Sequence, residues 1–309
     1  MSALRISLFG NVTVIHATAS TPLQLSQGSQ ALFAFLLLQR HLIPRDILMD
    51  VFWGEYSTDR AQSNLTTAVW RLRQVLEPSE VTPGTYLISK KRGEVGFNWD
   101  SSHWLDTDSF EKQLLPVLRK PVATLDVNDL KTIEEALSLY RGDLLEGMYE
   151  DWALRERERF RSLHLSCLTR LMQYFFERKE YEQSILFGQE ILRRDPLHEE
   201  IHRTLMRMYL QSGQHAHALR QYEQCRAVLR RELNVSPLEE TEILYHQIIT
   251  ASRVSVPTSQ KTVSSEVAQL LHELQAVKDR LAEMGQILER VSQAAERLTL
   301  GGDEAVTIR

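Results

Sequence analysis

The chain has few residues that could form disulfides or cross a membrane. Only two of its 309 residues are cysteine, and Cys167 and Cys225 both lie in apolar helical stretches. We therefore expect two buried thiols rather than a disulfide or a reactive site. The apolar stretch at residues 31–38 is too short to span a bilayer, and residues 1–10 lack the pattern of a secretion signal. These absences favour a cytoplasmic protein with no membrane segment.

The sequence also lacks the phosphate-binding run Gly-x-x-x-x-Gly-Lys-Ser/Thr, so we expect no nucleotide-hydrolysing module of that type. Hydrophobic residues make up 43% of the chain and charged residues 25%, as in ordinary globular proteins. The net charge of −5 is unevenly spread, because residues 1–99 hold nine Lys or Arg and seven Asp or Glu whereas the remainder holds 27 and 34. A slightly basic N-terminal region weakly favours a polyanion as its partner.

What the chain does have is a self-similarity at a period of 34 residues. Leu171-Met172, Phe175, Tyr181 and Ser184-Ile185 recur as Leu205-Met206, Tyr209, His215 and Ala218-Leu219. This is the period of the tetratricopeptide helix pair, whose apolar face must be buried by a stacked neighbour. We predict a tetratricopeptide-like helical array over residues 106–251, opened by an irregular pair at residues 106–118 and 130–141. Such arrays hold partners rather than perform chemistry.

One motif inside the array indicates another class of protein. The run His198-Glu199-Glu200-Ile201-His202 matches H-E-x-x-H, which on a helix sets two imidazoles one turn apart for zinc and a Glu for general-base chemistry. The motif directly follows Asp195-Pro196, where a repeat helix should begin. We interpret Glu199 as a favourable charge at a helix start and place His202 at the repeat surface, with no metal and no cofactor. A zinc hydrolase is the distant alternative.

The first hundred residues predict a small α+β domain with the element order of a winged helix-turn-helix. Short strands are expected at residues 4–9 and 12–15 around the turn Gly10-Asn11, with a third extended piece near residues 23–25. Helices are expected at residues 29–40, 45–53 and 61–77, the last with a cap at Asp59 and a stop at Pro78. A hairpin of residues 86–89 and 96–99 follows, with a tip at residues 90–94.

The third of these helices and the hairpin present the chemistry of a DNA reader. Its apolar residues recur at helical spacing and should face the core: Ala61, Leu65, Ala68, Val69, Leu72 and Leu76. Polar residues on the other face can reach base edges in the major groove, and the basic tip can meet phosphates, although such faces are also common as solvated surfaces. The predicted DNA contacts are Gln62, Ser63, Asn64, Thr67, Trp70, Arg71, Arg73, Gln74, Lys90, Lys91 and Arg92.

Both halves of the chain carry a family resemblance. The run Leu48-Met49-Asp50-Val51-Phe52-Trp53-Gly54 and residues 61–78, which include Arg71-Leu72-Arg73 and end in Leu76-Glu77-Pro78, resemble the OmpR-type winged helix of the SARP class of bacterial transcriptional activators. Leu139-Tyr140-Arg141-Gly142-Asp143-Leu144-Leu145, Trp152 with Glu156-Arg157, residues 193–199, and residues 222–237 ending in Glu232-Leu233-Asn234-Val235-Ser236-Pro237 resemble that class's bacterial transcriptional activation domain. The resemblance covers about residues 4–251.

The resemblance implies where the partners bind. The third helix and the wing would bind promoter DNA, and the loop before that helix would lie near contacts with RNA polymerase. That loop is Gly54, Glu55, Tyr56, Ser57, Thr58 and Asp59. Two positions depart from the family pattern, because Trp70 stands where relatives usually have a small polar residue and Ser63 where Asn is frequent. The DNA sequence that is read therefore cannot be copied from the family.

The C-terminal part predicts a coiled coil after a linker at residues 252–262. An unbroken 3-4 spacing of apolar residues follows, typical of a narrow coiled-coil seam with a parallel dimer as the simplest product, although a single amphipathic helix packed on the array is an alternative. The seam residues are Val267, Leu270, Leu274, Val277, Leu281, Met284, Leu288, Val291, Ala295 and Leu298.

The sequence thus predicts a mainly α protein of four parts. These are an OmpR-type winged helix at residues 1–100, a tetratricopeptide-like activation domain at 106–251, the linker at 252–262 and a coiled coil at 263–300. We interpret the chain as a non-enzymatic, sequence-specific transcription activator whose partners are double-stranded DNA, RNA polymerase and a second copy of itself in a homodimer. The alternative is a tetratricopeptide adaptor whose winged helix makes protein contacts.

Overall fold

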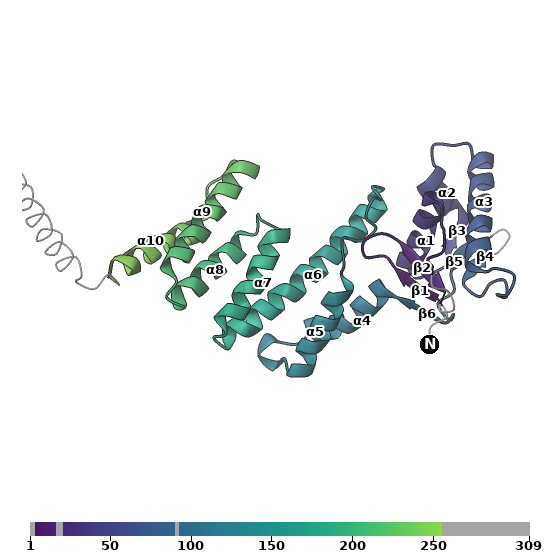
Figure 1. Cartoon of the computed structure of the whole chain (residues 1–309). Helices are drawn as coiled ribbons and strands as arrows, with labels where there is room; N and C mark the ends of the chain where they lie inside the picture. Colours follow the sequence, from purple (N-terminus) through teal and green to yellow (C-terminus); the bar gives the residue numbers. More distant parts are fainter. Residues whose placement is uncertain (1–3, 17–20, 90–92, 255–309) are drawn as a thin grey trace, which may run out of the picture. The chain divides into compact units, whose positions relative to one another are not determined.

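The computed structural model of the chain describes residues 4–16, 21–89 and 93–254 (Figure 1). It divides into a unit that ends at Leu238 and a second unit that begins at Glu239. The second unit is described only through the helix α10 (Glu239–Val254). Residues 252–254 are thus helical where the sequence predicted a linker, because no Pro or Gly interrupts the chain before Pro257. The rest of that linker, the predicted coiled coil and residues 90–92 of the hairpin tip lie outside the described residues.

The head, residues 4–105, contains two small sheets. In the first, β1 (Leu4–Ser7) pairs antiparallel with β2 (Thr13–His16) and parallel with β6 (His103–Leu105). The predicted third piece near residues 23–25 is wrong as a strand, since Leu23 makes only one hydrogen bond to the Val14 carbonyl and Pro22 has no N–H to donate. Its place is taken by β6, which comes from beyond the hairpin.

The second sheet has the order β3-β5-β4 and contains the predicted hairpin. It consists of β3 (Ile43–Pro44), β4 (Leu87–Ser89) and β5 (Glu94–Phe97), all antiparallel. The hairpin is confirmed, although β5 begins at Glu94, earlier than expected, because residues 94 and 95 pair with β3. Gly96 permits this close approach: a Cβ there would lie 2.7 Å from Leu42 Cδ2.

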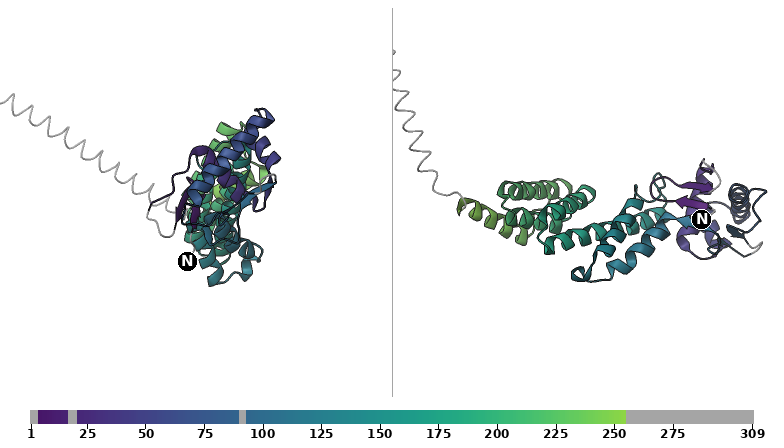
Figure 2. Two further views of the ribbon diagram at one scale, coloured as in Figure 1. Left: turned by 90° about the vertical axis from the view of Figure 1, so that its right-hand side faces the viewer. Right: turned by 60° about the horizontal axis from the view of Figure 1, so that its bottom comes forward.

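Three helices complete the head: α1 (Gln27–Gln39), α2 (Arg45–Trp53) and α3 (Thr58–Leu76). All three were predicted, and α2 begins directly after Pro44, as expected. The helix α1 is buried on several sides, and Phe33 meets Phe97 of β5 edge-on with ring centroids 5.9 Å apart. The helices α2 and α3 pack against each other, and α3 lies at the outer side of the head (Figure 2).

The array consists of successive helix pairs (Figure 1). Its described helices are α4 (Asp106–Leu118), the short 3-10 helix η1 (Val122–Thr124), α5 (Val127–Leu139), α6 (Asp151–Glu177), α7 (Tyr181–Arg194), α8 (Glu199–Gln211) and α9 (His215–Glu232). The pairs α6–α7 and α8–α9 confirm the predicted repeat. The helix α5 begins three residues earlier than expected, because Asp126 and Asp129 form a capping box there.

The 34-residue period also sets how the helices end. Lys179 and Gly213 are one period apart, and both adopt left-handed backbone angles, with φ of 62° and 73°. After each of them, an N–H bonds back to the helix: Glu180 N donates to Phe175 O and Gln214 N to Tyr209 O. This is the Schellman motif, which satisfies carbonyls at a helix end. The repeat therefore extends to the turn geometry between the paired helices.

The head and the start of the array share one hydrophobic core. The Phe9 ring of the head lies within 5.4 Å of the rings of Phe110, Tyr140 and Phe160, measured between centroids. On the other side of the head, Trp152 of α6 meets Phe35 with ring centroids 5.1 Å apart. The aromatic contacts make the head and the helices α4, α5 and α6 one packed body.

Polar contacts reinforce this junction. The buried Asp106 carboxylate accepts hydrogen bonds from the backbone N–H groups of Leu8 and Phe9, at 2.9 and 3.0 Å. Burial raises the pKa of this carboxyl, against the lowering effect of the backbone donors. In the same region, Glu111 of α4 forms ion pairs with Arg40 of the head and Arg159 of α6. Since these partners come from three segments, they fix the head on α4 and α6.

Two further predictions can be compared with the helices: that both cysteines are buried, and that the chain has no membrane segment. Cys167 and Cys225 are both buried, as predicted, and burial raises the pKa of the Cys167 thiol to about 12. None of the helices in the described ranges combines the length and the apolar character that crossing a bilayer requires.

Candidate nucleic-acid interface

The helix α3 separates apolar and polar residues as its sequence predicts. Ala61, Leu65, Val69, Leu72 and Leu76 are buried, and Ala68 is half-buried. The opposite face is exposed over more than three turns, with Gln62, Ser63, Thr66, Thr67, Trp70, Arg71 and Gln74 in solvent. Asn64 is half-buried at the border between the two faces. We name the exposed set, with Asn64, the outer face of α3.

The start of α3 differs from the prediction. The helix begins at Thr58, with Ser57 as its first flanking residue and the Ala61 N–H donating to the Ser57 carbonyl at 2.9 Å. The expected cap at Asp59 is therefore wrong, and Asp59 lies in the first turn, where its charge suits the positive helix end. Thr58 and Asp59 also leave the loop in which they were expected, so the loop shortens to residues 54–57.

Arg73 is directed at the protein rather than along the outer face. Its guanidinium donates to the Leu87 carbonyl of β4 at 2.9 Å and forms an ion pair with Glu77 at 3.2 Å. The buried Glu77 carboxylate in turn accepts hydrogen bonds from the N–H groups of Gly84, Tyr86 and Leu87. Arg73 and Glu77 therefore hold α3 against the hairpin, and this use of Arg73 competes with its predicted contact to DNA.

Arg71 and Trp70 are placed differently from Arg73. Arg71 is exposed and forms no ion pair with any residue in the described ranges, so its guanidinium is available to a ligand. The Trp70 side chain is 60% exposed, an unusual position for an indole without a partner. The hydroxyls of Thr66 and Thr67 donate to the carbonyls of Gln62 and Ser63, at 2.8 and 2.9 Å. Each of these hydroxyls keeps its lone pairs as acceptors.

The hairpin of β4 and β5 corresponds to the predicted wing, and the structure describes it on both sides of residues 90–92. The strand β4 packs against α3, and Arg45 at the start of α2 donates to the Ser89 hydroxyl at 3.2 Å. The predicted contacts Lys90, Lys91 and Arg92 lie outside the described residues. Glu94, expected at the tip, belongs to β5 and pairs with Pro44 in the register of the sheet. The hydrogen bond from Arg45 places Ser89, the last described residue before the tip, next to the first turn of α2.

The loop between α2 and α3 is a tight turn at the surface. Tyr56 N donates to the Trp53 carbonyl at 3.0 Å, and all four residues from Gly54 to Ser57 are exposed. A Cβ at Gly54 would lie 2.7 Å from the Asp50 carbonyl oxygen, so the turn needs glycine there. The guanidinium of Arg60 covers the Tyr56 ring at 5.0 Å. The loop therefore has a fixed shape and exposes an aromatic ring.

Sequence analysis missed two residues of this surface. Thr66 lies on the outer face of α3 and Arg60 at its N-terminal end, and both are exposed. Thr66 was inside the predicted helix at residues 61–77, and Arg60 directly preceded it. A helical projection that starts at residue 58 instead of 61 includes Arg60 and shows it at the surface. For Arg60 the signal was thus in the helix boundary, which depends on backbone geometry around Ser57. For Thr66 the apolar spacing of the predicted helix already placed it on the polar side.

The H-E-x-x-H motif is used for packing. His202 is buried, so its predicted surface position is wrong: Nε2 bonds to the Pro196 carbonyl at 3.0 Å and Nδ1 to Gln221 Nε2 at 2.6 Å. Because both ring nitrogens are engaged, neither is left to bind zinc. Glu199 lies in the first turn of α8, as predicted, and accepts from Leu238 N. Across the part of the chain that the structure describes, no cluster of His, Cys, Asp or Glu could hold a metal ion.

Comparisons with known proteins agree with the fold. Residues 105–249 match the bacterial transcriptional activator domain. The chain is 25% identical to the regulatory protein AfsR of Streptomyces coelicolor over 270 residues and 25% identical to AfsR of Streptomyces griseus over 252 residues. These matches cover 87% and 81% of this chain but only 26% and 25% of the relatives. The chain therefore spans about a quarter of the length of these curated relatives.

A solved structure has the same fold. The Mycobacterium tuberculosis protein EmbR, solved in complex with a low-affinity phosphopeptide, superposes with a TM-score of 0.66 at 17% identity. The match covers 89% of this chain and 72% of that one. The match thus includes both the head and the array. The activator-domain match and the two AfsR relatives together support the resemblance of this chain to the SARP-type bacterial transcriptional activators.

Proposed function

We propose that the chain is a non-enzymatic, sequence-specific DNA-binding regulator that activates transcription by recruiting RNA polymerase. The observation that carries the proposal is the outer face of α3: a row of exposed amide, hydroxyl and guanidinium groups on a helix held rigidly against a hairpin. Such a helix fits the major groove, where Arg, Asn and Gln distinguish base pairs by their donors and acceptors. The match of residues 105–249 to the bacterial transcriptional activator domain and the similarity to the regulatory protein AfsR support a role in regulating transcription.

Within this proposal the residues of the head divide their tasks. Arg71, Gln62, Asn64 and Gln74 read base edges, the methyl groups of Thr66 and Thr67 and the Trp70 ring contact apolar groups of the groove, and Lys90, Lys91 and Arg92 bind phosphates. Arg73 acts by holding the hairpin in place. The exposed loop of residues 54–57, with the ring of Tyr56, is the proposed contact with polymerase.

The proposed partners also include a second copy of the chain. The proposed interface is the heptad seam from Val267 to Leu298, which lies outside the described residues and rests on its apolar spacing alone. Deleting residues 263–309 should give a monomer that still binds one half-site, whereas binding to a paired site should fall by about 10²- to 10⁴-fold. Light scattering measures the mass, and an unchanged oligomer after the deletion would place the interface elsewhere.

The test of DNA binding is the substitution Arg71→Ala. A side chain that reads a base through two hydrogen bonds contributes about 1–3 kcal/mol of discrimination, so affinity for the target should fall by roughly 5- to 150-fold while circular dichroism and unfolding stay unchanged. The target is found by protection mapping of the promoter region upstream of the chain's own gene. Retained affinity in folded Arg71→Ala protein would contradict the orientation of α3.

The wing gives a second, independent readout. Replacing Lys90, Lys91 and Arg92 by Ala should weaken binding to all DNA sequences alike. The plot of log affinity against log salt should flatten by about 0.9 for each phosphate that the tip no longer neutralises. An unchanged slope would mean that the tip does not touch DNA.

The second candidate is an adaptor whose head binds protein, and the exposed Trp70 favours it, because indoles are common anchors of protein interfaces. The same measurements separate the two. A head that binds duplex DNA only weakly, with no preference for sequence and no effect of Arg71→Ala, would favour the adaptor.

A further inference from the structure

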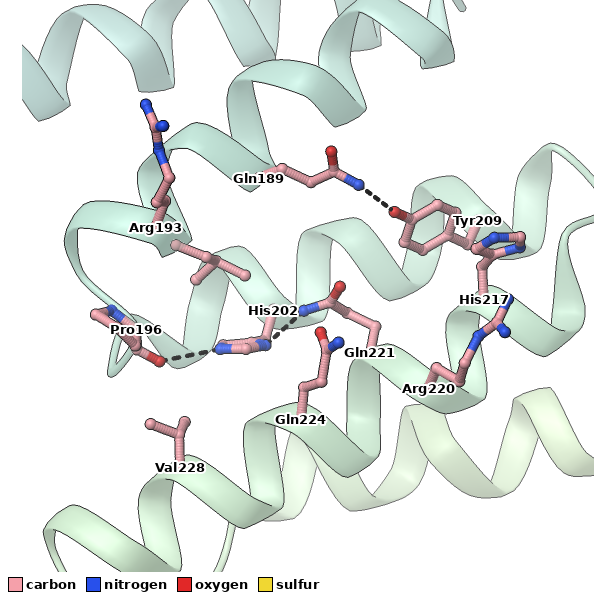
Figure 3. Close-up of a pocket in the computed structure, with 11 residues that line it drawn as sticks. Gln189, Arg193, Pro196, His202, Tyr209, His217, Arg220, Gln221, Gln224 and Val228 are labelled. Atoms are coloured by element: carbon pink, nitrogen blue, oxygen red, sulfur yellow. Dashed lines mark hydrogen bonds between the residues drawn. The ribbon is translucent and has the colours of Figure 1, made fainter.

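A groove of about 460 Å³ lies between α7 and α9, with α8 as its floor (Figure 3). Most of its lining comes from α7 and α9, the second helices of the two repeats, and only His202 and Tyr209 come from α8. The groove is therefore separate from the head and from the loop of residues 54–57.

The floor of the groove has a fixed hydrogen-bonding pattern. The Pro196 carbonyl can only accept, so the His202 Nε2 that bonds to it at 3.0 Å carries the proton. The other ring nitrogen, Nδ1, must then accept from the Gln221 amide at 2.6 Å (Figure 3). With its NH₂ group held in this way, the Gln221 amide keeps its carbonyl oxygen as an acceptor. The floor is thus neutral, and its polar groups are held in one orientation.

Next to this floor, the Tyr209 hydroxyl is prepared to donate. It accepts a hydrogen bond from Gln189 Nε2 at 2.9 Å, which leaves its own proton for another partner. The imidazole of His217 stacks on the Tyr209 ring, with centroids 5.4 Å apart and planes at 28°. This stacking restricts the phenol ring on one side.

The walls are cationic. Arg193 and Arg220 flank the groove, and no Asp or Glu is among the described residues that line it. Arg193 is partly neutralised by an ion pair with Glu190, whereas Arg220 is exposed and pairs with no carboxylate in the described part of the chain. Leu192, Pro196 and Val228 also line the groove and supply its apolar surface. The groove therefore offers positive charge, an oriented donor and an apolar strip.

The exposure of the groove decides the kind of ligand. More than half of its lining residues are at least partly open to solvent, including Gln189, Arg193, His217, Arg220 and Gln224. A small molecule usually needs most of its surface buried to bind well, which this groove cannot provide. An extended peptide is longer than the groove and can use it for one or two side chains, while the amides of Gln189 and Gln224 at the rim match its backbone N–H and C=O groups.

We propose that this groove binds a peptide segment of a protein partner in which an Asp or Glu stands next to an apolar residue. The carboxylate bonds to Arg220 and the Tyr209 hydroxyl, and the apolar side chain lies on Leu192 and Val228. Charge-assisted hydrogen bonds to a guanidinium are among the strongest in proteins, so Arg220 contributes most of the selectivity for an acidic peptide. The site is independent of DNA binding by the head.

The test uses the full chain and a random octapeptide library displayed on phage. Peptides selected by the wild-type protein should carry Asp or Glu beside an apolar residue, and synthetic versions should lose about tenfold or more in affinity when that carboxylate is changed to the amide. Arg220→Glu should cause a similar or larger loss. Its matched control is Arg226→Glu, the same charge reversal on the same helix but outside the groove.

A charge swap distinguishes a contact from a structural role. Peptides in which the acidic residue is replaced by Lys should bind Arg220→Glu protein better than wild-type protein. Selected peptides without carboxylates, no selected peptide at all, or equal binding by wild type and Arg220→Glu would each overturn the proposal. So would displacement of the peptide by free glutarate at equal concentration, which would mark a small-molecule site. DNA affinity should be the same in all these variants, so a failure of this proposal is separate from a failure of the DNA proposal.

Discussion

The helices α3 and α8 both carry polar residues at spacings that suggest a site, and the structure uses them in opposite ways. On α3 the polar set lies in solvent, and in the described part of the chain no helix or strand covers it. On α8 the second histidine of the motif is 4% exposed and bonded on both nitrogens. The helices that flank α8 make the difference, because α7 and α9 enclose it.

The comparison teaches that spacing along a helix gives the direction of a side chain but not what lies opposite to it. Arg71 and Arg73 are two residues apart on α3, and they point to solvent and to β4 respectively. His198 and His202 are one turn apart, yet only His202 meets the Gln221 amide. The four predictions below test this contrast between outward and inward residues, from the largest expected effect to the smallest.

The inward face of α3 should control stability. Leu65 is fully buried, so Leu65→Ala should lower the free energy of unfolding by about 2–5 kcal/mol through reduced burial and a residual cavity. Its neighbour Thr66 is exposed, and Thr66→Ala should change stability by no more than about 0.5 kcal/mol. Urea unfolding followed by circular dichroism measures both, and similar losses in the two variants would refute the assigned faces.

Arg73 should behave as an inward residue although it is charged. Arg73→Ala leaves the buried Glu77 carboxylate without its ion pair and the Leu87 carbonyl without that donor, so unfolding should become easier by about 2 kcal/mol. Arg71→Ala is the control and should leave stability unchanged. The contrast fails if Arg71→Ala destabilises the head as much as Arg73→Ala does.

The two histidines of the motif should differ in the same way. His202→Ala removes the partner of the Pro196 carbonyl and of the Gln221 amide, at an expected cost of about 1–2 kcal/mol in unfolding free energy. His198→Ala, at the flanking position of α8, should cost less than about 0.5 kcal/mol. Elemental analysis of the wild-type protein should find no stoichiometric zinc. A bound zinc ion, or equal effects of the two substitutions, would restore the metal interpretation.

The buried histidines should make the array sensitive to acid. Burial lowers the pKa of His164 from 6.5 to about 4, and it also lowers the pKa of His202. Both rings are neutral in the folded state and bind protons more readily when unfolded. The contribution of His164 to stability is therefore complete above about pH 6.5 and is lost as the pH falls toward 4. The His164 ring contributes a slope of up to about 1.4 kcal/mol per pH unit in that window, and His202 acts in the same direction.

The pH effect is measured as a difference between proteins. Unfolding free energies of wild type and His164→Phe are compared at several pH values from 7.5 to 4.5. The wild-type value minus the variant value should decrease as the pH falls. If this difference in unfolding free energy stays constant, His164 is protonated in the folded protein as readily as in the unfolded one.

Much of the helical part of the fold could be predicted because its signals are local. The bounds of α2 and α4 follow from Pro44 and from apolar spacing, and the 34-residue repeat marked two helix pairs. What sequence analysis missed depends on distant partners. The strand β6 pairs with β1 across about a hundred residues, and the residues 23–25 that looked like a strand lie close to β1 in the chain but do not pair with it.

In the candidate site, too, the features that depend on local spacing could be predicted, and those that depend on distant partners could not. The apolar spacing of α3 was enough to assign its outer face, because a single helix of known phase has only two sides. It could not assign Arg73, since the Leu87 carbonyl reaches it only after the hairpin folds back. It could not detect the groove between α7 and α9 either, because that groove joins residues of three helices.

By itself, the sequence determined most of the helices, the helical repeat and the phase of α3, because each depends on spacing within one segment and on the residues that begin and end a helix. Only the tertiary structure decided that Asp106 and Phe9 join the head to the array, that Arg73 braces the hairpin and that His202 is a buried structural residue. These outcomes depend on which segments pack against each other, and burial turns a polar side chain into a partner of whatever donor or acceptor lies opposite.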